Sequence, residues 1–182
     1  MQQLISLLVE NKPGALMRVA GVLTARGYNI ESLTVAKTLD PAMSSMTIVA
    51  DVDPVMRPLL IKQITRLVNV VEAVDLTESQ AVCRELALIK VKVAPDMRAA
   101  LLKEADIFRA KVVDAAPASY TLEVTGASEK LDALIGLLHN YGEVEMIRSG
   151  AMAMPRSPQT NKHSGFSEAV RNGEKTAVPV KI

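Results

Sequence analysis

Two spacings of hydrophobic residues alternate along the first half of the chain. Apolar runs of strand length are followed by stretches in which apolar residues recur every three or four positions, as on one face of a helix. Leu16, Val19 and Leu23 show the helical spacing, and Gly27 follows them as a stop signal. The pattern predicts a strand at 2–10, a helix at 15–27, strands at 28–39 and 45–53, a helix within 54–69 that Pro58 confines to the residues after it, and a strand at 70–77.

The second half repeats this order with little residue identity. It predicts a strand at 85–93, a helix at 95–109, strands at 110–117 and 119–126, a helix at 128–142 and a strand at 143–154. Asp96 is placed to cap the first of these helices and Ser128 the second, with Glu129 in its first turn. Each half matches the split βαβ arrangement. The predicted fold class is therefore α+β, with two ferredoxin-like βαββαβ domains in tandem.

The expected domains lie at 1–78 and 85–155, with a linker at 79–84 between them. Residues 156–182 lose the apolar periodicity and gather Pro, Ser, Asn and Gly. That composition predicts a flexible tail with one helical turn around 168–171.

Composition and charge exclude several classes of protein. The 21 Lys and Arg residues are balanced by 20 Asp and Glu residues, so no surplus of positive charge is available to hold nucleic-acid phosphates. No apolar run approaches the ~20 residues of a membrane-spanning helix, and Glu10 and Lys12 interrupt the first run before it could form a secretory signal. A single cysteine, Cys83, is typical of a reducing compartment. We expect a soluble, cytoplasmic protein.

Candidate catalytic and metal-binding groups are few. His139 and His163 are the two histidines, and we expect both to be solvated, at a helix end and in the tail. Cys83 is expected to be a small apolar filler. Asp51 and Asp53 share one face of a strand end, where solvation is favoured over acid–base work. The chain has no phosphate-binding glycine loop and no set of three or four convergent metal ligands. We predict neither a catalytic residue nor a metal site.

The turn "NKPGAL" at residues 11–16 is the most unusual stretch of the sequence. With Pro13 as the first helical residue, the N-cap would be Lys12, which offers no acceptor oxygen to the free amides. The amides of Gly14, Ala15 and Leu16 would then form an anion site at the helix N-terminus.

Two asparagines flank that predicted anion site. Asn11 and Asn29 add side-chain amides, so a free amino acid matches the set of groups. A tight strand-to-helix turn without a ligand, in which Asn11 serves as a loop former, fits the same residues equally well. The second half has Asp96 and Met97 where the first has proline and glycine, so sensing is expected in the first half alone.

Two stretches together resemble a known family. "LLVENKPGALMRVAGVLTARGYNIESL" at 7–33 is similar to the N-terminal ACT domain of the small, regulatory subunit of acetohydroxyacid synthase (acetolactate synthase), and "RELALIKV" at 84–91 to the entry into that family's second domain. The resemblance covers roughly residues 3–155. It implies a non-catalytic protein of branched-chain amino-acid biosynthesis that activates a large catalytic subunit and confers allosteric feedback inhibition by valine.

The resemblance also implies where valine binds, namely at an ACT–ACT interface in a homodimer, with an intermolecular sheet. The matching positions are Asn11, Gly14, Ala15 and Leu16 for the polar end of the amino acid, with Asn29 and Ile30 from the neighbouring protomer. No cofactor is expected in this chain, whereas thiamine diphosphate, Mg and FAD are expected on the catalytic partner. The preference among branched-chain amino acids stays open, because one methylene is worth only ~1–3 kcal/mol.

Three other functions remain as alternatives. The first is a stand-alone amino-acid-binding ACT protein that regulates a different enzyme. The second is an amino-acid-sensing enzyme with its catalytic part in the second domain, although residues 84–154 show no convergent polar groups. The third is an ACT-containing transcription regulator, which would need a helix-turn-helix or a basic patch.

Overall fold

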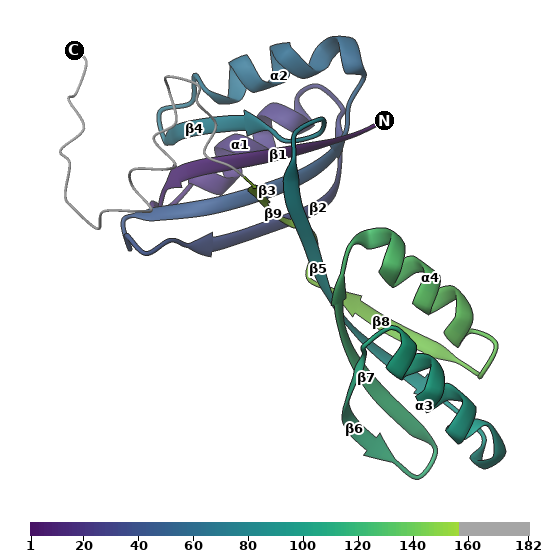
Figure 1. Ribbon diagram of the computed structural model, residues 1–182. Helices are drawn as coiled ribbons and strands as arrows, with labels where there is room; N and C mark the ends of the chain where they lie inside the picture. Colours follow the sequence, from purple (N-terminus) through teal and green to yellow (C-terminus); the bar gives the residue numbers. More distant parts are fainter. Residues whose placement is uncertain (157–182) are drawn as a thin grey trace. The chain divides into compact units, whose positions relative to one another are not determined.

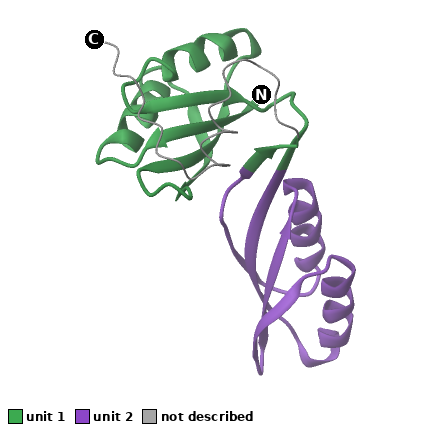
Figure 2. Cartoon of the chain, turned by 60° about the vertical axis from the view of Figure 1, so that its left-hand side comes forward, with its two compact units in different colours: residues 1–82, 153–182 green, residues 83–152 purple. Residues whose placement is uncertain are grey.

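A computed structural model describes residues 1–156 of the chain (Figure 1). These residues form two compact units, one of Met1–Val82 with 153–156 and the other of Cys83–Met152 (Figure 2). Each unit is built from an antiparallel sheet and two helices, which confirms the predicted α+β class and the repeated order of elements. The predicted tail, with its helical turn around 168–171, lies outside the described residues.

Unit 1 is a four-stranded antiparallel sheet with strand order β2-β3-β1-β4. Its elements are β1 (Gln2–Glu10), α1 (Ala15–Thr24), β2 (Asn29–Lys37), β3 (Met43–Asp51), the 3₁₀ turn η1 (Pro54–Met56), α2 (Arg57–Ile64) and β4 (Val70–Asp75). The two edge strands, β2 and β4, each carry an irregularity in their pairing, between Ile30 and Ser32 on β2 and opposite Leu8 and Val9 on β4.

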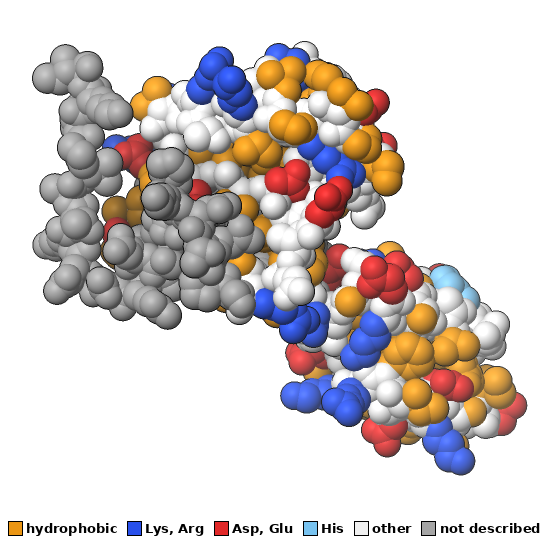
Figure 3. Space-filling view, turned by 45° about the horizontal axis from the view of Figure 1, so that its top comes forward, with side chains coloured by type: hydrophobic (Ala, Val, Ile, Leu, Met, Phe, Trp, Pro, Cys, Tyr) orange, Lys and Arg blue, Asp and Glu red, His pale blue; other side chains and the backbone are white. Residues whose placement is uncertain are grey.

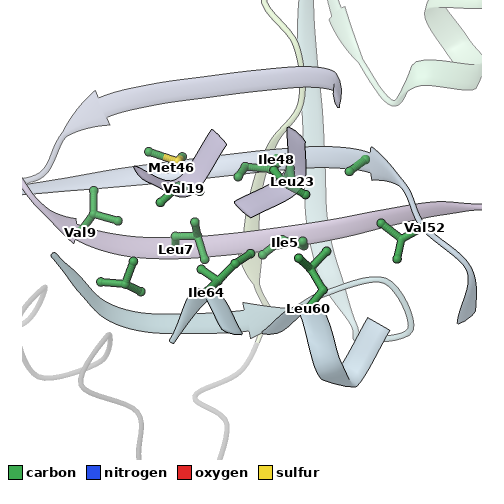
Figure 4. Packing of buried hydrophobic residues seen from close by; sticks show 12 residues of the cluster. Ile5, Leu7, Val9, Val19, Leu23, Met46, Ile48, Val52, Leu60 and Ile64 are labelled. Atoms are coloured by element: carbon green, nitrogen blue, oxygen red, sulfur yellow. The ribbon is translucent and has the colours of Figure 1, made fainter. Parts of the chain in front are cut away.

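The core of unit 1 lies between this sheet and both helices. Alternate residues of β1 (Ile5, Leu7 and Val9) point to the face that α1 and α2 cover (Figure 4). Val19 and Leu23 of α1 and Leu60 and Ile64 of α2 complete the buried cluster, together with alternate residues of β3. Each such side chain contributes roughly 1.5–3 kcal/mol when fully buried, so the apolar pattern read from the sequence determines which sheet face the helices cover.

Unit 2 repeats the arrangement with the strand order β6-β7-β5-β8, and β9 also pairs with β5. Its elements are β5 (Ala81–Lys92) from Cys83 onward, the 3₁₀ turn η2 (Pro95–Met97), α3 (Arg98–Ile107), β6 (Lys111–Ala116), β7 (Ser119–Gly126), α4 (Ser128–Leu138) and β8 (Val144–Arg148). The first residue of β9 (Met152–Pro155) belongs to unit 2 and the other three to unit 1. Ile89 and Val91 of β5 pack with Leu101 of α3 and Leu131 and Leu134 of α4 in a second buried cluster.

Several element boundaries differ from the prediction. The helix expected at 15–27 ends at Thr24, because Gly27 adopts φ +70° and lets the Tyr28 N–H donate to the Leu23 carbonyl at 3.1 Å. β5 begins at Ala81, so the residues expected as a linker at 79–84 include four residues of a strand. The last strand is interrupted at Gly150, which has φ +81° and separates β8 from β9.

Both predicted caps of the second half are wrong, while Glu129 does lie in the first turn of α4. Asp96 lies inside η2, where it makes no capping hydrogen bond. Ser128 is already the first residue of α4, and its hydroxyl donates to the Glu85 carboxylate instead of capping the helix. Glu85 is buried and also pairs with Arg148, with 3.5 Å between Oε2 and Nη1.

Candidate functional site

The turn between β1 and α1 is built around a left-handed glycine. Gly14 is the N-cap of α1 with φ +84°, and the helix begins at Ala15. The predicted assignment of Lys12 as N-cap and Pro13 as first helical residue is therefore wrong. The Ala15 N–H instead donates to the Lys12 carbonyl at 3.2 Å, which closes a tight turn before the helix starts. Only glycine takes this φ without steric cost.

Three backbone amides at this helix end stay open. Among residues 1–156, Gly14, Leu16 and Met17 have no acceptor for their N–H groups, and no side chain caps α1. The expected contribution of the Ala15 amide is not available, because the turn itself uses it. The first turn of α1 contains no acidic residue that would compete with an anion. The helix end therefore has both the free donors and the partial positive charge that favour a carboxylate.

Asn11 joins this turn to the loop that precedes β3. Its Nδ2 donates to the Pro41 carbonyl at 2.9 Å, and its backbone N–H donates to the Ala42 carbonyl at 2.7 Å. The side chain is exposed, with the second N–H and the amide oxygen still available for a ligand. Leu16 and Met17, which are 40% and 72% exposed, supply apolar surface next to the open amides.

Asn29 and Ile30 lie at the other end of the same sheet. Asn29 is opposite Asp51 at the end of β3, whereas Glu10, next to Asn11, is opposite Met43 at its start. At ~3.3 Å per residue, the nine residues of β3 separate these two ends by about 26 Å. A single chain therefore does not bring Asn29 to the glycine turn. The side chain of Asn29 is exposed and donates to Glu31 at 2.6 Å, and Ile30 packs partly against the core.

The structure reveals a polar network beside the turn that the sequence pattern did not predict. Asn69, in the loop before β4, donates from Nδ2 to Glu10 Oε2 at 2.7 Å and accepts from the guanidinium of Arg18. Glu10 also accepts from Lys12 Nζ at 3.1 Å. Hydrogen bonds from Asn69 and Lys12 hold the pKa of Glu10 below its usual value. The only sequence signal was one polar residue inside the apolar run "LVNVV" (67–71).

Unit 2 contains the equivalent of this turn, and its hydrogen bonds identify the matching residues. The Met97 N–H donates to the Ala94 carbonyl at 3.1 Å, as Ala15 does to Lys12. Asp96 therefore occupies the position of Gly14, and the proline is retained as Pro95, one residue away from the predicted match. Asp96 has no positive φ and lies in a 3₁₀ turn, so the second copy lacks the glycine conformation of the first.

The other polar candidates offer no catalytic arrangement. His139 is exposed at the C-terminus of α4, and His163 lies outside the described residues. Asp51 pairs with the N-terminal ammonium group, and Asp53 accepts the Val55 N–H at 2.9 Å. Burial and the charge of Glu85 raise the pKa of the Cys83 thiol, which lowers its reactivity at neutral pH.

Residues 1–156 contain neither a cluster of metal ligands nor a membrane-spanning helix. No three His, Cys, Asp or Glu side chains gather there as metal ligands. None of the helices in this part of the chain is long and apolar enough to cross a membrane. On the face drawn in Figure 3, basic and acidic side chains are interspersed.

Comparison with known proteins gives two family matches. Residues 5–72 match the "AHAS small subunit-like ACT domain" and residues 84–157 match the "Small subunit of acetolactate synthase". The chain is 43% identical to the acetolactate synthase small subunit of Mycolicibacterium smegmatis, over 85% of this chain and 91% of that protein. It is 42% identical to the probable acetolactate synthase small subunit of Methanothermobacter thermautotrophicus, over 86% and 94%.

A solved structure is also similar to this chain. The crystal structure of the acetolactate synthase small subunit from Thermotoga maritima matches with a TM-score of 0.77 and 36% identity. The match covers 87% of this chain and 99% of that one. Sequence and fold therefore give the same relatives over nearly all of the described residues.

Proposed function

The chain belongs to the family of acetolactate synthase small subunits, and we propose that it binds valine and makes the catalytic subunit of that enzyme sensitive to feedback inhibition. In this role it would raise the activity of the thiamine-diphosphate-dependent catalytic subunit in the cytoplasm and catalyse no reaction itself. The observation that carries the proposal is the Gly14 turn, which presents open amides at the N-terminus of α1 beside the exposed Asn11.

The chemistry of the turn fits the two ends of an amino acid. The amides of Gly14 and Leu16 are donors for the carboxylate, and the free amide oxygen of Asn11 is an acceptor for the ammonium group. Ala15 is buried beneath them, so it shapes the floor of the site rather than donating to the ligand. The exposed part of Leu16 offers an aliphatic contact for a branched side chain.

A homodimer supplies what one chain lacks. β2 is an edge strand, so two copies can pair their β2 edges about a two-fold axis. Antiparallel pairing of this kind places the start of one β2 opposite the end of the other, which is the end nearer the glycine turn. Asn29 and Ile30 of one protomer then approach Asn11 and Gly14 of its partner, and each dimer has two shared sites.

Regulation follows from the shared site. Valine that bridges two protomers favours the arrangement of the ACT domains that it fits best. If the catalytic subunit binds another arrangement more tightly, valine lowers the affinity of the chain for the catalytic subunit. By linkage, the catalytic subunit lowers the affinity of the chain for valine by the same factor. The second unit, which lacks the left-handed glycine, would serve contact with the catalytic subunit.

The first test is titration of the full chain with valine, leucine and isoleucine by calorimetry, followed by assay of the catalytic subunit with and without the chain. We expect binding of a branched-chain amino acid, activation of the catalytic subunit, and inhibition by the same amino acid. Binding without any effect on the acetolactate synthase catalytic subunit would favour a stand-alone ACT protein that regulates a different enzyme. Turnover of pyruvate by the chain alone would contradict a regulatory role.

The second test asks whether each site is shared. Gly14→Asp places a carboxylate at the anion site, and Asn29→Lys places a positive charge where the ammonium group would lie. Either variant alone should lose both sites of the dimer. Mixed dimers of the two variants carry both defects in one site and none in the other, so one of the two sites in each mixed dimer should bind again. No recovery on mixing would show that the site lies within one chain.

A further inference from the structure

We propose that Asn69 is a positioning residue for the amino-acid site, because it fixes the strand end and the helix start on either side of the glycine turn. The inference rests on the proposed function and deepens it. Asn69 belongs to neither flanking element and would not touch the ligand. It acts by holding Glu10, the last residue of β1, and Arg18 in α1 in one relative arrangement.

The contacts of Asn69 reach both elements from a buried position. The residue is only 6% exposed. Its Nδ2 donates to Glu10 Oε2 at 2.7 Å, and its backbone carbonyl accepts the Glu10 N–H at 2.8 Å. Its Oδ1 accepts from Arg18 Nη1, and the Arg18 N–H donates to the Gly14 carbonyl at 3.0 Å. A chain of hydrogen bonds thus runs from the end of β1 through Asn69 to the N-cap glycine.

Asparagine is suited to this place because one side chain must donate to a carboxylate and accept from a guanidinium group. An aspartate could accept from Arg18 but has no donor for Glu10, and it would place a second negative charge beside the first. An apolar residue would remove the donor to Glu10 Oε2 and the acceptor for Arg18 Nη1, and hydrogen bonds to charged groups are among the strongest in proteins. Glu10 extends the network into the turn, where it accepts from Lys12 Nζ at 3.1 Å.

The second unit has the same backbone hydrogen bond at the end of its first strand, without the buried side-chain contacts. The Lys92 N–H donates to the Glu143 carbonyl at 3.0 Å, as Glu10 does to Asn69. Within residues 1–156, the Glu143 side chain pairs with Lys92 alone, at 2.7 Å, and both side chains are more than half exposed. The position of Arg18 is taken by Ala100, which has no donor to offer. We call the buried contacts of Asn69 with Glu10 and Arg18 the bracket. The bracket therefore accompanies the glycine turn and is not a requirement of the βαββαβ fold.

The effect on the site is preorganisation. The open amides of Gly14, Leu16 and Met17 bind a carboxylate best when the helix start does not move relative to the strand that carries Asn11. A turn that is rigid before binding loses less conformational entropy when the ligand arrives. Loss of the bracket is therefore expected to weaken affinity while the apolar core, which Asn69 does not join, keeps unit 1 folded.

The test is calorimetric titration of the full chain with valine, comparing wild type, Asn69→Asp and the matched control Glu143→Gln. At about pH 8, we expect Asn69→Asp to bind valine about tenfold more weakly, because Glu10 loses the buried donor to its Oε2 and faces a like charge. Glu143→Gln changes the equivalent residue of unit 2 and should bind like wild type. Arg18→Met breaks the other half of the bracket and should weaken binding to a similar extent.

A pH series separates positioning from general destabilisation. The two adjacent carboxylates disfavour each other's charge, while the cations of Arg18 and Lys12 beside them favour it, so the pair takes up a proton as the pH is lowered more readily than Glu10 does beside Asn69. The resulting O–H donor replaces the lost N–H donor, and the affinity of Asn69→Asp should recover toward that of wild type. A variant that is merely less stable would not gain affinity in acid.

The outcomes are distinguishable. Weaker valine binding by Asn69→Asp with recovery in acid, and a circular dichroism spectrum like that of wild type, supports the bracket. Wild-type affinity in both Asn69→Asp and Arg18→Met overturns it, as does a loss that acid does not reverse. Failure of the wild-type chain to bind any branched-chain amino acid would overturn the proposed function and this inference together.

Discussion

The two βαββαβ units place different residues at the same position of the same turn. In unit 1, Gly14 with φ +84° ends the turn, and α1 follows with no capping side chain. In unit 2, Asp96 stands in its place and the chain winds into a 3₁₀ turn before α3. Both turns keep a proline and the same closing hydrogen bond, at 3.2 and 3.1 Å.

The comparison separates what builds the fold from what builds the site. The frame comes from alternating apolar residues on the strands and helical spacing on the helices, and both units have it. Of the two turns, only the first has the left-handed glycine and the buried contacts of Asn69 with Glu10 and Arg18. A feature that the fold can lose in one copy is not needed for folding, so its presence in the other copy favours a role in binding.

The largest effect is expected from cavities in the two cores. Leu7 and Ile89 occupy equivalent, fully buried positions on the central strands β1 and β5. Leu7→Ala and Ile89→Ala should each cost about 2–5 kcal/mol of the free energy of unfolding. Differential scanning calorimetry should show each variant lowering the transition temperature of its own unit. Valine affinity should fall in Leu7→Ala, which changes the unit that carries the site, more than in Ile89→Ala. One shared transition that shifts equally in both variants would show that the units unfold together.

The second effect concerns the glycine itself. Gly14→Asp, which gives the first turn the residue of the second, should weaken valine binding at least tenfold, or ~1.4 kcal/mol, by repelling the carboxylate. Gly14→Asn is the matched control, because Asn tolerates the left-handed region as well as Asp does and carries no charge. No atom of a distant residue lies within 4 Å of a Cβ at Gly14, so both variants share only the cost of the left-handed backbone at φ +84°.

A second control for that experiment lies at the other end of the same helix. Gly27 also has positive φ and open space around a Cβ, so Gly27→Asp tests backbone cost without adding charge at the site. We expect it to bind valine like wild type. Unchanged valine affinity in Gly14→Asp by calorimetry would reduce the turn to a purely structural element.

The smallest effect is expected where the second unit departs from the first at a helix C-terminus. Arg109 adopts φ +55° at the place that Gly27 occupies in unit 1, and the Ala110 N–H closes the same hydrogen bond to Ala105 at 2.8 Å. Arg109→Gly should stabilise unit 2 by about 0.5–1 kcal/mol, because glycine takes this φ without the side-chain clash. Chemical denaturation should show a higher midpoint, and a lower one would contradict this reading of the C-cap.

The apolar spacing predicted most of this fold because it reports directly which face of each element is buried. It failed at the ends of elements, where single hydrogen bonds decide. Lys12 was predicted as the N-cap on the rule that proline prefers the first helical position, but Gly14 could take a left-handed φ and delay the helix. Ser128 was predicted as a cap and instead donates to Glu85, a partner far away in sequence.

The candidate site was predictable only in part, for the same reason. Proline, glycine and asparagine in "NKPGAL" indicated an unusual turn, and the residue types predicted a carboxylate ligand. The bracket could not be predicted, because its members Glu10, Arg18 and Asn69 come from three segments that only the sheet order brings together. The distance between Asn11 and Asn29 along β3 likewise required the strand register.

The unequal edges of the unit 1 sheet have a consequence for assembly. β2 spans nine residues and β4 only six, and the pairing of β4 with β1 is interrupted after Leu8. Addition of β2 to β4 of another copy would be head-to-tail, could repeat without end, and would leave a third of β2 unmatched. Addition of β2 to β2 matches equal lengths and covers the longer edge of both copies at once. The edge lengths thus favour a closed pair over a growing filament.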